Sequence, residues 1–314
     1  MNMLTKIRHL ISGPEISLFH EFHQPPYGGG NQFLLALEKE FKQRGLDVGR
    51  NKVGPRTKIC LFNSFNFDFE KLMKLKQKFP QVKMVHRVDG PISAYRGTDE
   101  AVDKKIWEIN HQLADQTIFQ SQYSLDEHTK MGLVFKNPIV ITNASDPVIF
   151  NRDNRATFPQ PDLKVHLIAV SWSDNPKKGG AILSWFDEHL DQSRFTLTFV
   201  GRTQASLKHA QVLPPLNSEA LAKVLKRHDI YLAVSENDPC SNALIEALSC
   251  GLPAVYKKSG GHPELVKAGG ETFHSTADLL PALDKVANDY LNYQNQIKVA
   301  SLQEVADKYL QVML

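Results

Sequence analysis

The sequence has few of the features that mark a secreted, membrane-spanning or nucleic-acid-binding protein. Its 314 residues include three cysteines, Cys60, Cys240 and Cys250, with no CxxC pair. This odd set argues against a disulfide framework or a structural zinc site and fits a reducing compartment. No stretch approaches the roughly 18 consecutive apolar residues of a membrane span, and no signal-peptide cleavage site is expected. A net charge of +3 is too small for a dedicated nucleic-acid binder. We therefore expect a cytoplasmic protein.

The apolar segments predict an α/β protein. At roughly 150 residues per domain, the chain is long enough for two hydrophobic cores. Short apolar runs alternate with helical patterns, which predicts two doubly wound, Rossmann-like parallel sheets. The expected strands span residues 16–22, 58–62, 82–88 and 116–120, then 164–170, 195–200, 230–234 and 254–256.

Residues 144–161, with three prolines, form the expected linker between the domains. We expect an N-terminal domain over residues 1–155, completed by the C-terminal helix at about 285–314, and a second domain over 156–284. Doubly wound sheets bind ligands at the carboxyl ends of their strands. The site is therefore expected in a cleft where the two domains face each other.

A glycine-rich loop follows the first predicted strand. Gln24–Gly30 cannot continue a strand and supplies positive φ angles. Asn31 is expected to cap the next helix, which Gly45 closes. Strand, glycine loop and helix form the opening of a nucleotide-binding unit. The glycines do not match GxGxxG, so a dehydrogenase is disfavoured.

The most informative segment runs from Asp229 to Ala254 and is predicted to form a buried strand, a polar loop and a helix. Free backbone amides and the helix dipole at the start of this helix suit a phosphate group. The residues that would present these amides are Cys240, Ser241, Asn242 and Ala243.

Two carboxylates, Asp238 and Glu246, lie eight positions apart in the same segment. A carboxylate can accept two hydrogen bonds from a vicinal diol, so the pair could hold a sugar and a ribose. The alternative is structural: Asp238 would be a loop residue or a helix cap, and Glu246 would be a charge on the helix surface.

This segment resembles the E-x7-E motif of retaining GT-B glycosyltransferases, specifically glycosyltransferase family 4 (glycosyl transferases group 1). Other segments resemble the family in the expected order, so that the resemblance covers nearly the whole chain. These segments are Tyr27–Gly30, Val85–Pro91, Ala114–Ser121, Ile141–Phe150, Ser171–Gly179 and Ser259–Glu264.

The resemblance implies a GT-B fold and a hexosyltransferase that is retaining and metal-independent, with a nucleotide-diphosphate sugar as donor and no cofactor. A UDP-sugar is assumed because such donors are common. By position, Asp238 would contact the transferred sugar, Glu246 the ribose, and Lys178 the diphosphate, where a fixed cation also stabilises the leaving group. Gly29 and Gly30 would let the backbone of the first domain close on the donor.

Asp89, at a predicted strand end, is the candidate for contacting the acceptor or the reacting face; the alternative is a turn residue before Gly90. The acceptor could be a glycan, a lipid-linked molecule or a small molecule. Residues 50–83 hold nine basic and two acidic side chains. The basic helix predicted at 71–78 is either a solvated face or a surface for an anionic acceptor or a membrane.

Two departures from the family pattern favour an alternative function. Asp replaces the usual first Glu at position 238, and no Arg precedes Lys178 in its loop, where Ser171, Trp172 and Ser173 lie. The alternative is a catalytically degenerate, GT-B-like sugar-nucleotide-binding or partner subunit. An epimerase or hydrolase of the same fold would need an acid/base pair that the sequence does not show clearly.

Overall fold

In the computed structural model we describe residues 12–24, 28–160 and 163–314. The chain forms two compact units, one of residues 1–94, 98–143 and 302–314, the other of 95–97 and 144–301. The expected boundary at residue 155 and the expected return at about residue 285 therefore both fall inside the second unit. The reason is burial, because Phe150 and Tyr290 are core residues of that unit.

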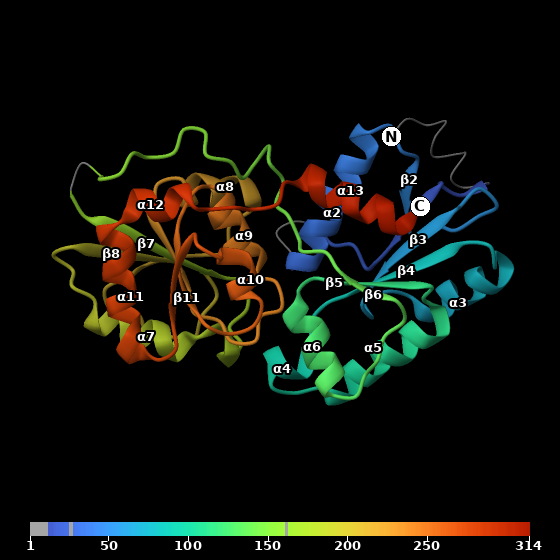
Figure 1. Ribbon diagram of the computed structural model, residues 1–314, viewed down its shortest axis with the longest axis horizontal. Helices are drawn as coiled ribbons and strands as arrows, with labels where there is room; N and C mark the ends of the chain where they lie inside the picture. The colour runs from blue at the N-terminus through green and yellow to red at the C-terminus, as the bar shows by residue number, and fades with distance from the viewer. Residues whose placement is uncertain (1–11, 25–27, 161–162) are drawn as a thin grey trace. The chain divides into compact units, whose positions relative to one another are not determined.

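The first unit is built on a parallel six-stranded sheet with strand order β2-β1-β3-β4-β5-β6 (Figure 1). In its centre, β1 pairs with β3 and β3 with β4, so that Phe19 lies opposite Phe62 and Asn63 lies opposite Arg87. Its elements are β1 (Ile16–Phe19), α2 (Gly29–Gln43), β2 (Val48–Arg50), β3 (Ile59–Asn63), α3 (Phe69–Lys78), β4 (Lys83–Val88), α4 (Ile92–Arg96), α5 (Glu100–Leu113), β5 (Gln116–Phe119), α6 (Gln122–Lys130), β6 (Pro138–Val140) and α13 (Leu302–Met313).

Helices cover both faces of this sheet. Figure 1 shows α2 and α13 on one face and α3, α5 and α6 on the other. The C-terminal helix α13 packs on α2, where the rings of Phe33 and Tyr309 lie 5.7 Å apart and Arg44 forms an ion pair with Asp307. The last helix is thus part of the first unit, although the chain reaches it through the second.

The second unit has the same design, with strand order β12-β11-β10-β7-β8-β9 and only parallel pairs. Its elements are β7 (Val165–Ser171), the 3-10 helix η1 (Pro176–Lys178), α7 (Gly180–His189), β8 (Phe195–Gly201), β9 (Gln211–Leu213), α8 (Ser218–Leu225), β10 (Ile230–Ala233), α9 (Asn242–Ser249), β11 (Ala254–Lys257), α10 (His262–Val266), β12 (Gly270–Phe273), α11 (Thr276–Asn288) and α12 (Tyr290–Asn295).

Two apolar layers enclose this second sheet. On one face, α7, α11 and α12 contribute buried residues such as Phe186, Leu283 and Tyr290. On the other face, α8, α9 and α10 contribute residues such as Leu225 and Leu248. With both faces covered, the central strands are mostly apolar, as in other parallel sheets.

The fold class is confirmed: both units are doubly wound α/β domains of the Rossmann-like type. The eight expected strands all occur, within three residues at each end. The sequence analysis did not predict β2, β6, β9 and β12. These four are the edge strands of the two sheets. Each has only three or four residues, and an edge strand packs against one neighbour only, so its apolar pattern is weak.

The predicted cap of α2 was wrong. The helix begins at Gly29 with Gly28 as its N-cap, so Asn31 lies inside the first turn. The side chain of Asn31 is buried and exchanges two hydrogen bonds with the backbone of His23, which shapes the preceding loop. Tyr27, part of the resemblance to the family, lies outside the described residues.

Three further features bear on earlier expectations. Among the described residues, no helix is long and apolar enough to cross a membrane. The predicted basic helix at 71–78 is α3, in which Leu72 is the one buried residue. Lys76 donates to the carbonyl oxygens of Pro80 and Val82, so part of this charge serves the local structure. The side chain of Asp68 caps this helix and accepts a hydrogen bond from the amide of Lys71.

Candidate functional site

The strand order of the second unit locates a ligand site. The chain reverses its direction of sheet growth between β7 and β10, which are neighbours in the sheet. Ligands of doubly wound sheets bind at such a switch point, outside the carboxyl ends of the strands. The two loops that start there span residues 172–179 and 234–241. They carry Lys178 and Asp238, so two of the predicted site residues lie on the two loops of the switch point.

Lys178 and Asp238 form an ion pair. Lys178 Nζ lies 2.8 Å from Asp238 Oδ2, and the backbone amide of Cys240 donates to Asp238 Oδ1 at 3.2 Å. Burial opposes ionisation of Asp238, which is 8% exposed, but the charge of Lys178 and the hydrogen bonds from Lys178 and the Cys240 amide outweigh it and lower the pKa of this carboxyl. Asp238 is therefore a fixed carboxylate, and the amide of Cys240 is already engaged by it.

Two glycines allow the loops to approach this closely. A Cβ atom on Gly179, whose φ is +82°, would lie 2.5 Å from the carbonyl oxygen of Val234. A Cβ atom on Gly260, whose φ is +62°, would lie 2.3 Å from the carbonyl oxygen of Asp238. Side chains at either position would clash with backbone in a conformation that favours glycine.

Helix α9 starts beside Asp238. Ser241 is its N-cap and accepts a hydrogen bond from the amide of Leu244 at 3.4 Å. The first turn, with Asn242 and Ala243, contains no acidic side chain. The positive end of the helix dipole is thus not neutralised by the helix's own residues, and it favours an anion at this position.

Glu246 lies one turn further along α9 in a different environment. Its side chain is half-buried, and no hydrogen bond or ion pair joins it to any residue in the described part of the chain. Burial raises the pKa of this carboxyl to about 8. The two acidic side chains of the motif therefore differ in ionisation, since Asp238 is paired and ionised while Glu246 is unpaired and holds its proton up to about pH 8.

The sequence analysis missed two residues that support this site. His262 is fully buried and donates from Nδ1 to the carbonyl oxygen of Lys257, so its Nε2 accepts from the hydroxyl of Ser235. Burial lowers the pKa of His262, which keeps the ring neutral. Glu236 pairs with Lys257 at 2.7 Å and with Lys177 at 3.3 Å. The position of His262 in the segment Ser259–Glu264 was the available signal.

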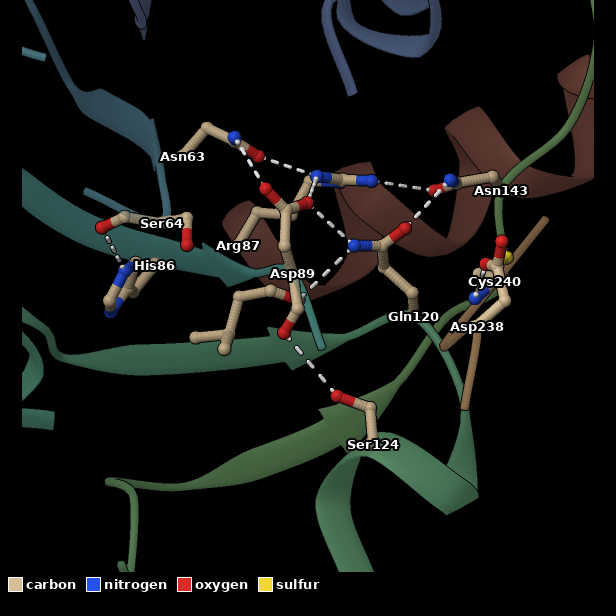
Figure 2. Close-up of polar contacts among 11 residues, drawn as sticks. Asn63, Ser64, His86, Arg87, Asp89, Gln120, Ser124, Asn143, Asp238 and Cys240 are labelled. Carbon is tan, nitrogen blue, oxygen red and sulfur yellow. Dashed lines mark hydrogen bonds and ion pairs between the residues drawn. The ribbon is translucent and has the colours of Figure 1, made fainter. Parts of the chain in front are cut away.

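In the first unit, polar side chains gather at the carboxyl ends of the strands. Asp89 directly follows β4 and is the centre of this group (Figure 2). Its Oδ1 accepts from Arg87 Nη1 at 2.7 Å and from Gln120 Nε2 at 2.6 Å, and its Oδ2 accepts from Asn63 Nδ2 at 3.3 Å. The Asp89 side chain is 24% exposed, so the group presents one carboxylate to the surface.

Arg87 connects this group beneath the surface (Figure 2). It is fully buried, it bonds Asn63 and Asp89 with Nη1, and its Nη2 donates to Asn143 Oδ1 at 2.9 Å. Asn143 in turn donates to Gln120 Oε1 at 2.8 Å, which closes a ring of hydrogen bonds. The sequence analysis did not single out Arg87, although an arginine inside a predicted central strand is itself a signal.

The two glycines predicted to line the donor site, Gly29 and Gly30, open α2. A Cβ atom on Gly30 would lie 3.7 Å from Asp89 Oδ1, so the start of α2 lies directly against the exposed carboxylate. All three cysteines are buried free thiols. In the described ranges, no group of three or more His, Cys, Asp or Glu side chains is arranged to hold a metal ion.

Residues 198–302 match the family model described as Glycosyl transferases group 1. The matched segment covers about a third of the chain and includes Asp238, Glu246 and His262. A comparison with curated proteins finds no match.

Solved structures are similar over nearly the whole chain. Sucrose-phosphate synthase from Thermosynechococcus elongatus has a TM-score of 0.73 and 15% identity, over 94% of this chain and 97% of that one. The catalytic domain of starch synthase IV from Arabidopsis thaliana, bound to ADP and acarbose, has a TM-score of 0.69 and 11% identity, over 96% and 99%. Anabaena HepE in complex with UDP-glucose has a TM-score of 0.65 and 16% identity, over 95% of each chain. At these identities, the likeness shows the fold alone.

Proposed function

We propose that the protein is a retaining, metal-independent glycosyltransferase that transfers a hexose-type sugar from a nucleotide-diphosphate sugar. The observation that carries the proposal is the Lys178–Asp238 ion pair at the switch point of the second unit. The match of residues 198–302 to the family model supports the same reading. The second unit binds the donor, and the first unit binds an acceptor that is a glycan, a lipid-linked molecule or a small molecule.

In this proposal, each donor group meets the side chain suited to it. Asp238 accepts hydrogen bonds from hydroxyls of the transferred sugar, and Glu246 accepts them from the ribose diol. Lys178 and the amides of Ser241, Asn242 and Ala243 bind the diphosphate. Lys178 also stabilises the negative charge that develops as the nucleotide leaves, because its ammonium group is held in place before the reaction.

Asp89 acts on the acceptor side. The three donors around its carboxylate fix its position, and the adjacent Gly30 leaves room for a ligand to approach. Catalysis comes from orienting the two substrates and from stabilising the leaving diphosphate. With no protein nucleophile assigned, the acceptor attacks from the face that the diphosphate leaves.

Nucleotide binding tests the donor site directly. UDP, GDP, ADP and CMP are screened by thermal shift, with and without EDTA, on the wild type and on Glu246→Ala and Lys178→Met. A ligand at about 100 times its Kd adds about 2.7 kcal/mol of stability. We expect one nucleoside diphosphate to stabilise the wild type regardless of EDTA and to lose this effect in both variants. Glu219→Ala, at an exposed position of α8, is the matched control.

Product analysis tests the reaction itself. Once the nucleotide is known, the matching sugar donor is incubated with glycan and lipid-linked acceptors, and the anomeric configuration of the product is read by NMR. An inverted anomeric carbon would refute the retaining mechanism while leaving the donor site intact.

A degenerate binding or partner subunit is the second candidate. It is favoured by the absence of an arginine from the loop that carries Lys178 and by the shorter Asp at position 238. Nucleotide binding without hydrolysis or transfer, in a protein whose Glu246→Ala variant no longer binds, would establish this alternative.

A further inference from the structure

The cations around the switch point of the second unit are already paired with acids. Lys178 pairs with Asp238, while Lys177 and Lys257 share Glu236. These three lysines and two carboxylates leave one net positive charge. A nucleoside diphosphate brings at least two negative charges, which one lysine that already has a carboxylate partner balances poorly.

Arg202 is a cation of a different kind. It directly follows β8, its side chain is exposed, and it forms no ion pair with any residue that the structure describes. The lysine of the same loop, Lys208, pairs with Glu188. The nearby Asp174 accepts from Gln204 at 3.5 Å rather than from Arg202. In loops 172–179, 202–210 and 234–241, every lysine pairs with an acidic side chain. Arg202 differs from them, since it has no acidic partner among the described residues.

The fold holds Arg202 against the loop that carries Lys178. The guanidinium carbon of Arg202 lies 4.7 Å from the ring centroid of Trp172, which directly follows β7. Its amide donates to the carbonyl oxygen of Ser171 at 2.9 Å. Gly201 permits this approach, since a Cβ atom there would lie 1.8 Å from the same oxygen, at a φ of +127°. Stacking on Trp172 restricts the guanidinium without neutralising it.

The same loop packs beside the start of α7, two residues after Lys178. A Cβ atom on Gly180 would lie 3.7 Å from Thr203 Oγ1 and 3.7 Å from the Cβ atom of Ala205. The far end of the loop is fixed by Asp187, a buried carboxylate that accepts hydrogen bonds from two backbone amides of the loop. Arg202 and Lys178 are therefore carried by adjacent, anchored segments at one edge of the sheet.

We propose that Arg202 binds the diphosphate of the donor and supplies from β8 the arginine that the β7 loop lacks. This inference rests on the proposed function. A guanidinium binds two phosphate oxygens through a planar, parallel pair of N–H donors, a fixed geometry that the ammonium group of Lys178 does not offer. In this proposal, Trp172 in the loop after β7 supports the diphosphate-binding residue, because its ring stacks on Arg202 at the end of β8.

Nucleotide affinities of Arg202→Gln test the proposal. Calorimetry measures the Kd of the nucleoside diphosphate that binds the wild type, of its monophosphate and of its nucleoside. We expect the variant to bind the diphosphate about ten-fold or more weakly, as for the loss of a hydrogen bond to a charged group. The affinity for the nucleoside should change less than about two-fold. Arg202→Lys should fall between the variant and the wild type.

The matched control is Arg194→Gln. Arg194 lies just before β8, and its guanidinium also stacks on an aromatic ring, that of Phe195 at 4.8 Å. It pairs with Asp284 instead of facing the switch point. We expect this variant to bind all three ligands as the wild type does. Unfolding midpoints of both variants show that each is folded.

Three results would overturn the proposal. Unchanged affinity of Arg202→Gln for the diphosphate would remove Arg202 from the site while leaving the proposed function in place. Equal weakening for the nucleoside and the diphosphate would place Arg202 at the nucleoside instead. A wild-type protein that binds no nucleoside diphosphate would overturn the proposed function and this inference together.

Discussion

Replacing Glu246 by glutamine is expected to change how the stability of the protein depends on pH. Burial raises the pKa of Glu246 from 4.5 to about 8 in the folded protein. Between these values the unfolded chain has lost a proton that the folded protein still holds. The free energy of unfolding therefore falls as pH rises through this range, and the fall ends once the folded carboxyl ionises near pH 8.

The size of the effect follows from the gap between the two pKa values. Each pH unit corresponds to about 1.36 kcal/mol. The gap from 4.5 to about 8 thus amounts to a total loss of about 5 kcal/mol, which is large beside the roughly 5–15 kcal/mol that stabilises a typical domain. Over the two units from pH 5.5 to pH 7.5 alone, the wild type should lose about 2.7 kcal/mol from this group. Glu246→Gln removes the titration and with it this part of the pH dependence.

Urea denaturation at pH 5.5, 6.5, 7.5 and 8.5 measures the effect. We expect Glu246→Gln to gain stability relative to the wild type at each step up to pH 7.5, and the difference to level off above pH 8. Glu219→Gln, at an exposed position on α8, should differ from the wild type by a constant amount. Parallel curves for the wild type and Glu246→Gln would refute the argument that burial without a partner controls this carboxyl.

Three further changes test the site and its support by urea denaturation. Lys178→Met should lower the free energy of unfolding by about 2–3 kcal/mol, because it leaves Asp238 without its ion-pair partner. The double variant Lys178→Met/Asp238→Asn should regain most of this stability. A double variant as unstable as the single one would contradict the importance of this ion pair. Gly260→Ala would place a Cβ atom 2.3 Å from the backbone oxygen of Asp238, whereas Gly132→Ala, also at positive φ, would place it in open space. Gly132→Ala should lower the free energy of unfolding by about 1–2 kcal/mol, and Gly260→Ala by more. Equal losses of stability would count against the close approach at Gly260. Arg87→Met should cost about 3–5 kcal/mol, since it removes a buried cation, whereas Arg87→Lys should cost less; a near-neutral Arg87→Met would show that the network is not coupled to folding.

The central part of each sheet was predictable because burial on both faces leaves a strong pattern. The runs 59–63 and 165–171 are mostly apolar, and helices with regular apolar spacing separate the strands. The edge strands β2, β6, β9 and β12 carry no such pattern, since their positions depend on pairing with a neighbour that is distant in the sequence. The start of α2 was misplaced for a related reason, because Asn31 bonds the backbone of His23 instead of capping the helix.

The candidate site was predictable to the extent that loop positions follow from strand order. Lys178 and Asp238 were predicted as separate contacts to the donor, and the structure joins them in an ion pair. That pairing depends on the approach of two loops 60 residues apart, which one sequence does not reveal. Arg87 and His262 were missed because their roles come from buried hydrogen bonds across strands and loops.

The ion pair also bears on why an aspartate can serve at position 238. Lys178 uses one of its three N–H donors on Asp238 Oδ2, and two remain for phosphate oxygens. Asp238 keeps lone pairs for a sugar hydroxyl after accepting from Lys178 and from the amide of Cys240. In the proposed donor complex, a sugar diphosphate can therefore engage both residues without breaking their contact.

Glu246 has no such partner, so its ionisation depends on the ligand. A ribose diol that donates two hydrogen bonds stabilises the carboxylate and lowers its pKa, so binding releases a proton where the empty protein still holds one. In the proposed donor complex, nucleotide affinity accordingly rises with pH until Glu246 ionises by itself near pH 8. Asp238 is ionised throughout this range and contributes no such dependence. In that proposed complex, the pH dependence of nucleotide binding is therefore a property of one carboxylate of the motif, although the proposal places both against the donor.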